Sequence, residues 1–183
     1  LCRFYDLETV ANYWEQILYI NEWQKKRIST LIIEKFFGTV SNKKIVILGF
    51  AFKSFTNDTR ESAAIKICKD LLEEGAFLSI HDPKVSKEQI HQDLGIEPLN
   101  SDIDYGERFD FFNLEGKWVF EDLIYKAVEK SDAVVVLTEW EEYKNIQWSS
   151  VEKKMVKPAW VFDSRSIVNA EEIKKAGLNL WRL

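Results

Sequence analysis

The chain has 183 residues, with 25 basic and 30 acidic side chains that give a formal net charge of −5 at pH 7. This acidic balance argues against a general nucleic-acid-binding protein, whose binding surface would be basic. Hydrophobic residues make up 46% and charged residues 30% of the chain, which excludes an intrinsically disordered protein. The length predicts one large domain or a domain with an appendage.

The two cysteines, Cys2 and Cys68, lie far apart, and the chain has only two histidines. This pattern argues against a disulfide framework and against a zinc site, and free thiols indicate a reducing compartment, here the cytoplasm. Cys68 is interpreted as an inert buried thiol on a helix. No apolar run approaches the about 20 residues of a membrane-spanning helix, so no membrane contact is expected. Because residue 1 is Leu, we expect the sequence to be part of a longer or processed gene product.

The first predicted element is one long helix over about residues 7–37, with Gly38 as its C-terminal stop. Apolar side chains recur at steps of three and four residues, at Val10, Trp14, Ile17, Ile28 and Leu31, and Asn21 and Gln24 share the stripe. About 30 residues form a rod of about 45 Å, which is long for a domain of this size. We favour a connecting helix that also packs against a partner over a core helix with frayed ends.

From residue 43 onward, short apolar runs alternate with helical patterns. Strands are predicted over residues 43–49, 76–80, 132–137, 158–162 and 178–181. Helices are predicted over residues 58–74, 87–94 (capped by Ser86), 122–130, 148–155 and 170–176. Residues 99–116 have no period and are interpreted as a long loop or insertion. The alternation predicts an α/β fold in which the long helix precedes a Rossmann-like, mostly parallel sheet with helices on both faces.

The loop after the first predicted strand, residues 49–62, has a single glycine and therefore lacks the GxGxxG pattern of dinucleotide-binding loops. A full dinucleotide site on this domain is thus disfavoured. Asp82 stands where a ribose-binding acid would lie, but we interpret it as a turn residue ahead of Pro83. Thr138 is interpreted as the cap of a turn, and Trp140 as a candidate aromatic wall for a base or sugar.

Three cations follow predicted strands and should meet at the carboxyl edge of the sheet, where open α/β sheets bind ligands. Lys53 and Arg60 follow the first strand, and Arg165 follows the fourth. They predict a phosphate or diphosphate site. The alternative is a set of surface cations in local ion pairs, Arg60 with Asp58 or Glu61 and Arg165 with Asp163.

Several segments together resemble the C-terminal part of UDP-glucose 6-dehydrogenases. The most specific is GFAFK at residues 49–53 followed by DTRES at residues 58–62. HDPKV at residues 81–85, TEW at residues 138–140 and KPAWVFD at residues 157–163 resemble later blocks of that family. Asn21, Gln24 and Arg27 fit its central helix, which links two domains and forms the dimer contact. The resemblance covers nearly the whole chain except about residues 99–116.

The resemblance implies an NAD-dependent enzyme that oxidises the C6 alcohol of UDP-glucose to the carboxylate, through aldehyde and cysteine-bound thioester stages. In that family an N-terminal domain holds most of the NAD and carries the nucleophilic cysteine, and that domain would lie upstream of this sequence. Cys2 lacks a GGSC-like context, and the resemblance implies that the family's catalytic lysine, asparagine, glutamate and aspartate also lie upstream. The chain is therefore expected to hold no catalytic residue and to be inactive alone. The implied division is a connecting and homodimerisation helix over residues 1–40 and a UDP-binding domain over residues 41–183.

Residue by residue, the resemblance implies that Phe52 and Lys53 contact the nucleotide sugar, that Arg165 binds it, and that Arg60 reaches the NAD. Departures that bear on substrate specificity are Phe55, Ser164 and Ser166. Two alternatives stay open. One is the same part of a dehydrogenase for UDP-N-acetyl-mannosamine or GDP-mannose, and the other is a non-enzymatic nucleotide-binding or dimerisation module.

Overall fold

The computed structural model describes residues 1–99 and 116–183 of the chain. A short 3-10 helix, η1 (Cys2–Tyr5), leads into the long helix α1 (Glu8–Lys35). The strands are β1 (Lys44–Leu48), β2 (Phe77–His81), β3 (Lys117–Phe120), β4 (Ala133–Val136), β5 (Trp160–Asp163) and β6 (Asn179–Arg182). The remaining helices are α2 (Ala63–Glu73), α3 (Lys87–Leu94), α4 (Ile124–Ala127), α5 (Glu141–Lys144), α6 (Trp148–Glu152) and α7 (Ala170–Lys175).

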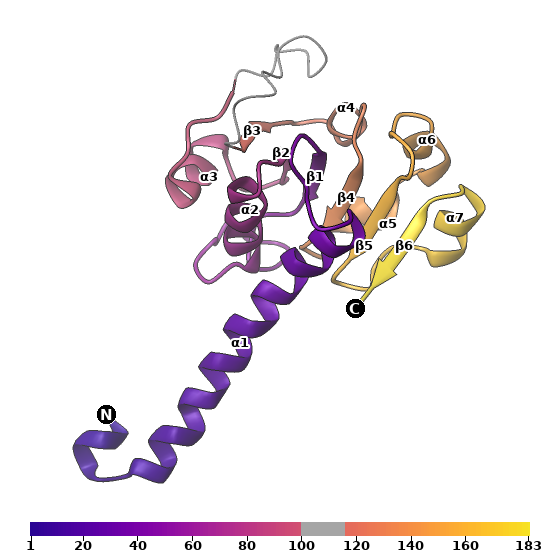
Figure 1. Cartoon of the computed structure of the whole chain (residues 1–183). Helices are drawn as coiled ribbons and strands as arrows, with labels where there is room; N and C mark the ends of the chain where they lie inside the picture. The colour runs from indigo at the N-terminus through magenta and orange to yellow at the C-terminus, as the bar shows by residue number, and fades with distance from the viewer. Residues whose placement is uncertain (100–115) are drawn as a thin grey trace.

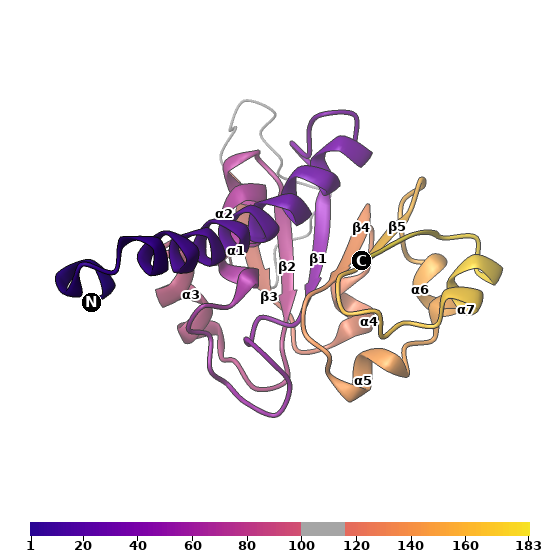
Figure 2. The same ribbon diagram turned by 90° about the horizontal axis from the view of Figure 1, so that it is seen from below.

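The strands form one sheet in the order β3-β2-β1-β4-β5-β6, and each of its neighbouring pairs is parallel. Ile45 of β1 pairs with Leu78 of β2 on one side and with Ala133 of β4 on the other. Helices α2 and α3 lie on one face, and α6 and α7 lie on the other (Figures 1 and 2). The predicted α/β fold with a parallel sheet is confirmed. The strand order reverses between β1 and β4, where sheets of this kind bind ligands.

The centre of the sheet forms the core. Every residue of β1, β2 and β4 is buried, which explains why their sequences are nearly continuous apolar runs. One face is covered by Ile67, Cys68 and Leu71 of α2. Cys68 is fully buried, and burial raises the pKa of its thiol, as expected of an inert structural cysteine.

Helix α1 belongs to the domain only at its C-terminal end. Ile28, Ile32 and Phe36 are buried against the sheet domain, and the hydroxyl of Ser29 donates to Asp70 of α2 at 2.6 Å. Gly38 (φ 91°) ends the helix, and its N–H binds the carbonyl of Ile33, so the predicted stop is confirmed.

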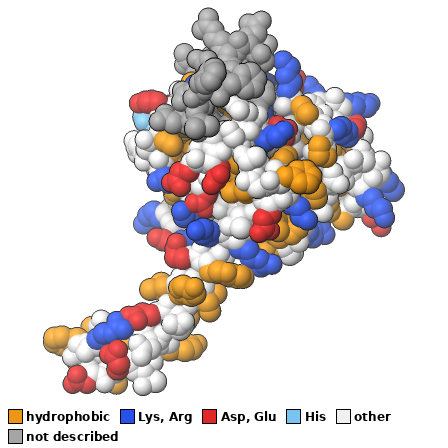
Figure 3. Space-filling model, viewed as in Figure 1, with side chains coloured by type: hydrophobic (Ala, Val, Ile, Leu, Met, Phe, Trp, Pro, Cys, Tyr) orange, Lys and Arg blue, Asp and Glu red, His pale blue; other side chains and the backbone are white. Residues whose placement is uncertain are grey.

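The N-terminal half of α1 projects away from the domain (Figure 1), and its apolar side chains lie on the surface (Figure 3). Trp14 is 56% exposed, and Val10 is exposed as well. These residues of the predicted apolar stripe are therefore not part of the domain core. In the described residues, no helix is both long enough and apolar enough to cross a bilayer.

Three predictions need correction or fall outside the described chain. The helix predicted from residue 58 begins at Ala63, because Glu61 has a positive φ (60°) and Ser62 caps α2 with its side chain. The helix predicted over residues 122–130 is the single turn of α4. Strand β3 was not predicted, since its four residues follow an aperiodic stretch. Of the predicted loop over residues 99–116, residues 100–115 lie outside the described residues.

Candidate functional site

The candidate site is built around the segment that follows β1, residues 49–54, which we call the β1 loop. Side chains of three different elements hold the backbone of Phe50 and Ala51. Asp82 accepts both of their N–H groups, at 2.7 and 3.0 Å. Ser62 donates to the carbonyl of Phe50, and Thr138 donates to the carbonyl of Ala51, each at 2.7 Å. The loop is therefore fixed before any ligand binds.

Gly49 makes this arrangement possible. It has a φ of 95°, and a Cβ at this position would lie 2.4 Å from the Cβ of Thr138. Only glycine adopts this conformation readily and allows the ends of β1 and β4 to approach so closely.

Asp82 is buried, and both of its carboxylate oxygens are occupied. One oxygen accepts the N–H groups of Lys84 and Val85, at 2.8 and 3.0 Å. The other accepts the indole N–H of Trp140 at 3.2 Å, in addition to the two amides of the β1 loop. The interpretation of Asp82 as a turn residue fits this geometry, which leaves neither oxygen free for a ribose. Its second role, tying the β1 loop to the end of β2, has no sequence signal.

Phe52 and Lys53 follow these fixed residues and point to the surface. Phe52 is 49% exposed, and its N–H binds the carbonyl of Asp58 at 2.9 Å. Lys53 is exposed, and no ion pair involves it among the described residues. Both side chains are thus accessible to a ligand, and their contact with a nucleotide sugar stays a prediction.

Arg60 lies in the turn before α2 and is paired locally. Its Nε and Nη2 donate to the two carboxylate oxygens of Asp58, at 2.9 and 2.7 Å. Hydrogen bonds from this guanidinium and from the Arg60 N–H lower the pKa of Asp58 to about 2. The structure shows the expected local pair, while the Arg60 side chain stays 89% exposed. Its contact with NAD remains a prediction.

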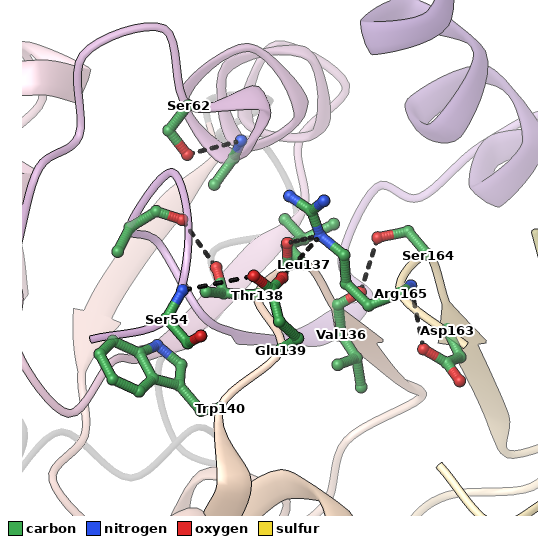
Figure 4. A network of polar contacts seen from close by, with 12 residues as sticks. Ser54, Ser62, Val136, Leu137, Thr138, Glu139, Trp140, Asp163, Ser164 and Arg165 are labelled. Atoms are coloured by element: carbon green, nitrogen blue, oxygen red, sulfur yellow. Dashed lines mark hydrogen bonds and ion pairs between the residues drawn. The ribbon is translucent and has the colours of Figure 1, made fainter. Parts of the chain in front are cut away.

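Arg165 follows β5 and reaches toward the segment after β4, residues 137–139, which we call the β4 turn. Its Nε donates to the carbonyl of Leu137 at 2.7 Å and lies 3.5 Å from the carboxylate of Glu139 (Figure 4). The alternative in which the Arg165 guanidinium pairs with Asp163 is wrong. From Arg165, the Asp163 carboxylate accepts the backbone N–H, at 3.1 Å, and it also accepts the N–H of Val168. Its ion pair is with Arg182.

Glu139 connects the two cationic segments. Its other oxygen lies 3.5 Å from the backbone nitrogen of Ser54, the residue after Lys53. The structure therefore brings the β1 loop and Arg165 together at one sheet edge, as predicted from the parallel strands. The linking role of Glu139 was missed, although its place directly after a strand end could have indicated it.

A small cavity of about 170 Å³ extends this edge toward α1. It is lined by Arg165 and Ser164 after β5, by Gln24, Lys25 and Ile28 of α1, and by Ala63, Ile67, Leu137 and Leu183. Lys25 carries a second cation into this region, and its amine pairs with Glu22 at 2.9 Å and Glu61 at 3.1 Å. Sequence reasoning placed Gln24 on α1 but did not predict that Lys25 would lie beside Arg165.

The roles predicted for the two other residues after β4 are wrong. The hydroxyl of Thr138 caps no turn, because it donates to Ala51. Trp140 is only 5% exposed, its indole N–H is bound to Asp82, and Phe55 lies against its ring with 6.1 Å between centroids. It therefore offers no open wall to a base or sugar. In the described residues, no cluster of His, Cys, Asp and Glu could hold a metal ion.

Comparisons with known proteins agree with the resemblance carried by the GFAFK and DTRES motifs. A model of the UDP-glucose/GDP-mannose dehydrogenase family, UDP binding domain, matches residues 46–170. UDP-glucose 6-dehydrogenase of Drosophila melanogaster is 41% identical over 180 residues, 98% of this chain and 36% of that protein. UDP-glucose 6-dehydrogenase 4 of Arabidopsis thaliana is 40% identical over 184 residues, the whole chain and 38% of that protein.

The chain thus spans little more than a third of the length of the curated relatives it matches. Among solved structures, a UDP-glucose dehydrogenase from the archaeon Pyrobaculum islandicum aligns with a TM-score of 0.66 at 23% identity, covering 93% of this chain and 33% of that one. At that identity the likeness shows the fold. The match of the family model over most of the sheet domain establishes that the chain belongs to the UDP-glucose/GDP-mannose dehydrogenase family and contains its UDP binding domain.

Proposed function

We propose that this chain is the UDP-sugar-binding part of an NAD-dependent UDP-glucose 6-dehydrogenase, which converts UDP-glucose to UDP-glucuronate. The observation that carries the proposal is the fixed β1 loop of a UDP binding domain. It carries the exposed Phe52 and Lys53 and is linked through Glu139 to Arg165 at one sheet edge. The two relatives at about 40% identity are both named UDP-glucose 6-dehydrogenases. Their names favour UDP-glucose over UDP-N-acetyl-mannosamine or GDP-mannose, and an enzyme over a non-enzymatic module.

In this proposal, Lys53 and Arg165 bind the anionic nucleotide sugar through charge-assisted hydrogen bonds. Binding energy gained on the UDP part holds the hexose in place, so that its C6 atom can meet reactive groups from outside this chain. No residue of this chain acts as the nucleophile. Cys68 is sealed in the core, and Cys2 lies before the projecting helix, outside the strand-end site.

Two features of the β1 loop argue against a site for the whole NAD on this domain. The β1 loop has one glycine, and the N–H groups of Phe50 and Ala51 that could bind a pyrophosphate are occupied by Asp82. We propose that NAD, which would accept the hydride, is held mainly by a part of the protein outside this chain. Arg60, exposed at the surface of the DTRES turn, is then the residue that reaches the cofactor from this side.

The projecting half of α1 supports a homodimer. Its surface carries a set of large exposed apolar side chains, namely Leu7, Val10, Tyr13, Trp14, Leu18, Tyr19, Ile20 and Trp23. Such a surface is typical of an interface. We propose that residues 1–40 form a connecting and dimerisation helix, that residues 41–183 form the UDP-binding domain, and that the protein works in the cytoplasm without nucleic-acid or membrane partners.

Calorimetric titration of the chain with UDP tests the proposed site. Lys53→Ala and Arg165→Ala should each weaken UDP binding by about 1.5–3 kcal/mol, the scale of a hydrogen bond to a charged group. Lys174→Ala is the matched control, because Lys174 is an exposed lysine on α7 and lines none of the site. Wild-type affinity in both site variants would contradict the proposal.

A further inference from the structure

The β4 turn lies between the two groups to which the proposed function assigns the nucleotide sugar. On one side, Thr138 donates its hydroxyl at 2.7 Å to the carbonyl of Ala51, two residues before Lys53. On the other side, the carbonyl of Leu137 accepts the Nε of Arg165, also at 2.7 Å. Figure 4 shows both contacts made by adjacent residues of a single turn. The relative placement of the lysine and the arginine is therefore set at this turn.

Thr138 is the residue on which the lysine side of this arrangement depends. It is fully buried, and no other donor reaches the carbonyl of Ala51 among the described residues. A buried carbonyl without a donor is costly, so loss of the hydroxyl should turn the carbonyl toward another partner. Because that carbonyl belongs to the peptide that leads into Phe52, such a rotation of the peptide would change the direction of the Phe52 and Lys53 side chains.

The arginine side is fixed at the same place. The carbonyl of Leu137 accepts a hydrogen bond from the Nε of Arg165. No hydrogen bond among the described residues involves the two terminal nitrogens of Arg165. In Figure 4 these nitrogens point away from the β4 turn. They are available to a ligand in a direction that the backbone of the β4 turn determines.

We propose that Thr138 is a positioning residue for the nucleotide sugar. Through Ala51 it holds the β1 loop at a set place relative to Arg165, so that Lys53 and Arg165 meet one ligand without prior ordering of the loop. The inference rests on the proposed function and adds the group that sets the geometry of its site. Thr138 itself need not touch the ligand.

Calorimetric titration with UDP of the 183-residue chain tests this role with a matched pair of variants. Thr138→Val keeps the shape of the side chain and removes the hydroxyl, and we expect UDP to bind about tenfold more weakly. Thr138→Ser keeps the hydroxyl, and we expect an affinity within about twofold of that of the unaltered chain. Rescue by serine separates the hydrogen bond from packing.

Ser131→Ala is the control for a general loss of stability. Ser131 is also fully buried and donates its hydroxyl to a backbone carbonyl, that of Val128, at 2.8 Å. It lies at the opposite end of β4, away from the site. We expect Ser131→Ala to lower the melting temperature without changing the affinity for UDP.

Several results would overturn the proposal. Wild-type affinity in Thr138→Val is one, and equal weakening in Thr138→Ser or Ser131→Ala is another. Failure of the unaltered chain to bind UDP would overturn the proposed function and the role of Thr138 with it. If Thr138→Val does not fold, hydrogen exchange of the backbone amides in the unaltered chain tests whether the β1 loop is ordered without ligand. The Phe50 and Ala51 amides should already be protected from exchange without UDP. A more than tenfold rise in their protection on adding UDP would show that the ligand orders the loop, and would overturn the proposal.

Discussion

At the residue scale, His81 forms a buried polar pair beside the site. Its Nδ1 lies 3.0 Å from the hydroxyl of Tyr143, which donates to the carbonyl of His81 at 3.1 Å. Burial lowers the pKa of His81 below its usual value, while the negative charges of Glu142, Asp82 and Asp122 act in the opposite direction. His81 also directly precedes Asp82, so disturbance of this pair would reach the anchor of the β1 loop.

The lowered pKa predicts how stability depends on pH. Between the usual histidine pKa of about 6.5 and the lower folded value, the unfolded chain binds more protons than the folded one. Stability should therefore fall as the pH drops from 7.5 toward 5.5. His81→Asn should flatten this dependence in thermal unfolding, whereas His91→Asn, at the half-buried histidine of α3, should retain it. An unchanged slope in His81→Asn would contradict the burial argument.

Residue roles were predictable where the cause is local in sequence. Ser86 as an N-cap and the Asp58–Arg60 pair involve partners only a few residues apart. The burial of Trp140 and the partner of Arg165 were not predictable, because they depend on which side chains from distant strands meet at the sheet edge. The same applies to the hydroxyl of Thr138, whose acceptor is 87 residues away in sequence.

At the element scale, α1 has two halves in different environments. Its C-terminal half is fastened to α2, where Asp70 accepts the hydroxyl of Ser29 and the amine of Lys66, each at 2.6 Å. Within the described part of the chain, its N-terminal half makes no side-chain hydrogen bond to the sheet domain, and exposed aromatic and aliphatic side chains cover it. Apolar periodicity predicted the helix correctly, but it could not indicate which half packs on the domain.

A charge placed on the projecting half should therefore disrupt self-association without unfolding the domain. Trp14→Glu should convert the proposed dimer into a monomer in analytical ultracentrifugation and leave the melting temperature of the sheet domain nearly unchanged. Ser150→Glu is the control, because it adds the same charge at an exposed position of α6, outside α1, so the dimer should persist. A dimer that survives Trp14→Glu would place the self-association surface elsewhere.

At the scale of the whole molecule, the parallel sheet could be predicted because strands buried on both faces have continuous apolar sequences. β1 and β4 are clear examples, whereas β3 escaped because its end residues are only partly buried and it follows an aperiodic stretch. The convergence of the strand ends then followed from topology alone, which is why the edge that joins the β1 loop and Arg165 was predicted correctly. The predicted helix start at residue 58 was wrong because of a local backbone feature that topology does not reveal. One residue in the left-handed conformation, Glu61, delays the start of α2.

The division of labour proposed for the whole protein leads to a last prediction. In the proposed function, the chain carries a strand-end site for an anionic nucleotide, and its described residues include neither an accessible cysteine at that site nor a glycine-rich loop for NAD. It should therefore bind UDP in calorimetry and show no rise in NADH absorbance when mixed with NAD and UDP-glucose. A full-length relative, such as the Drosophila melanogaster enzyme, serves as the positive control in the same assay. Turnover by the chain alone would mean that a reactive group within it has been overlooked, and Cys2→Ser would then be the first variant to examine.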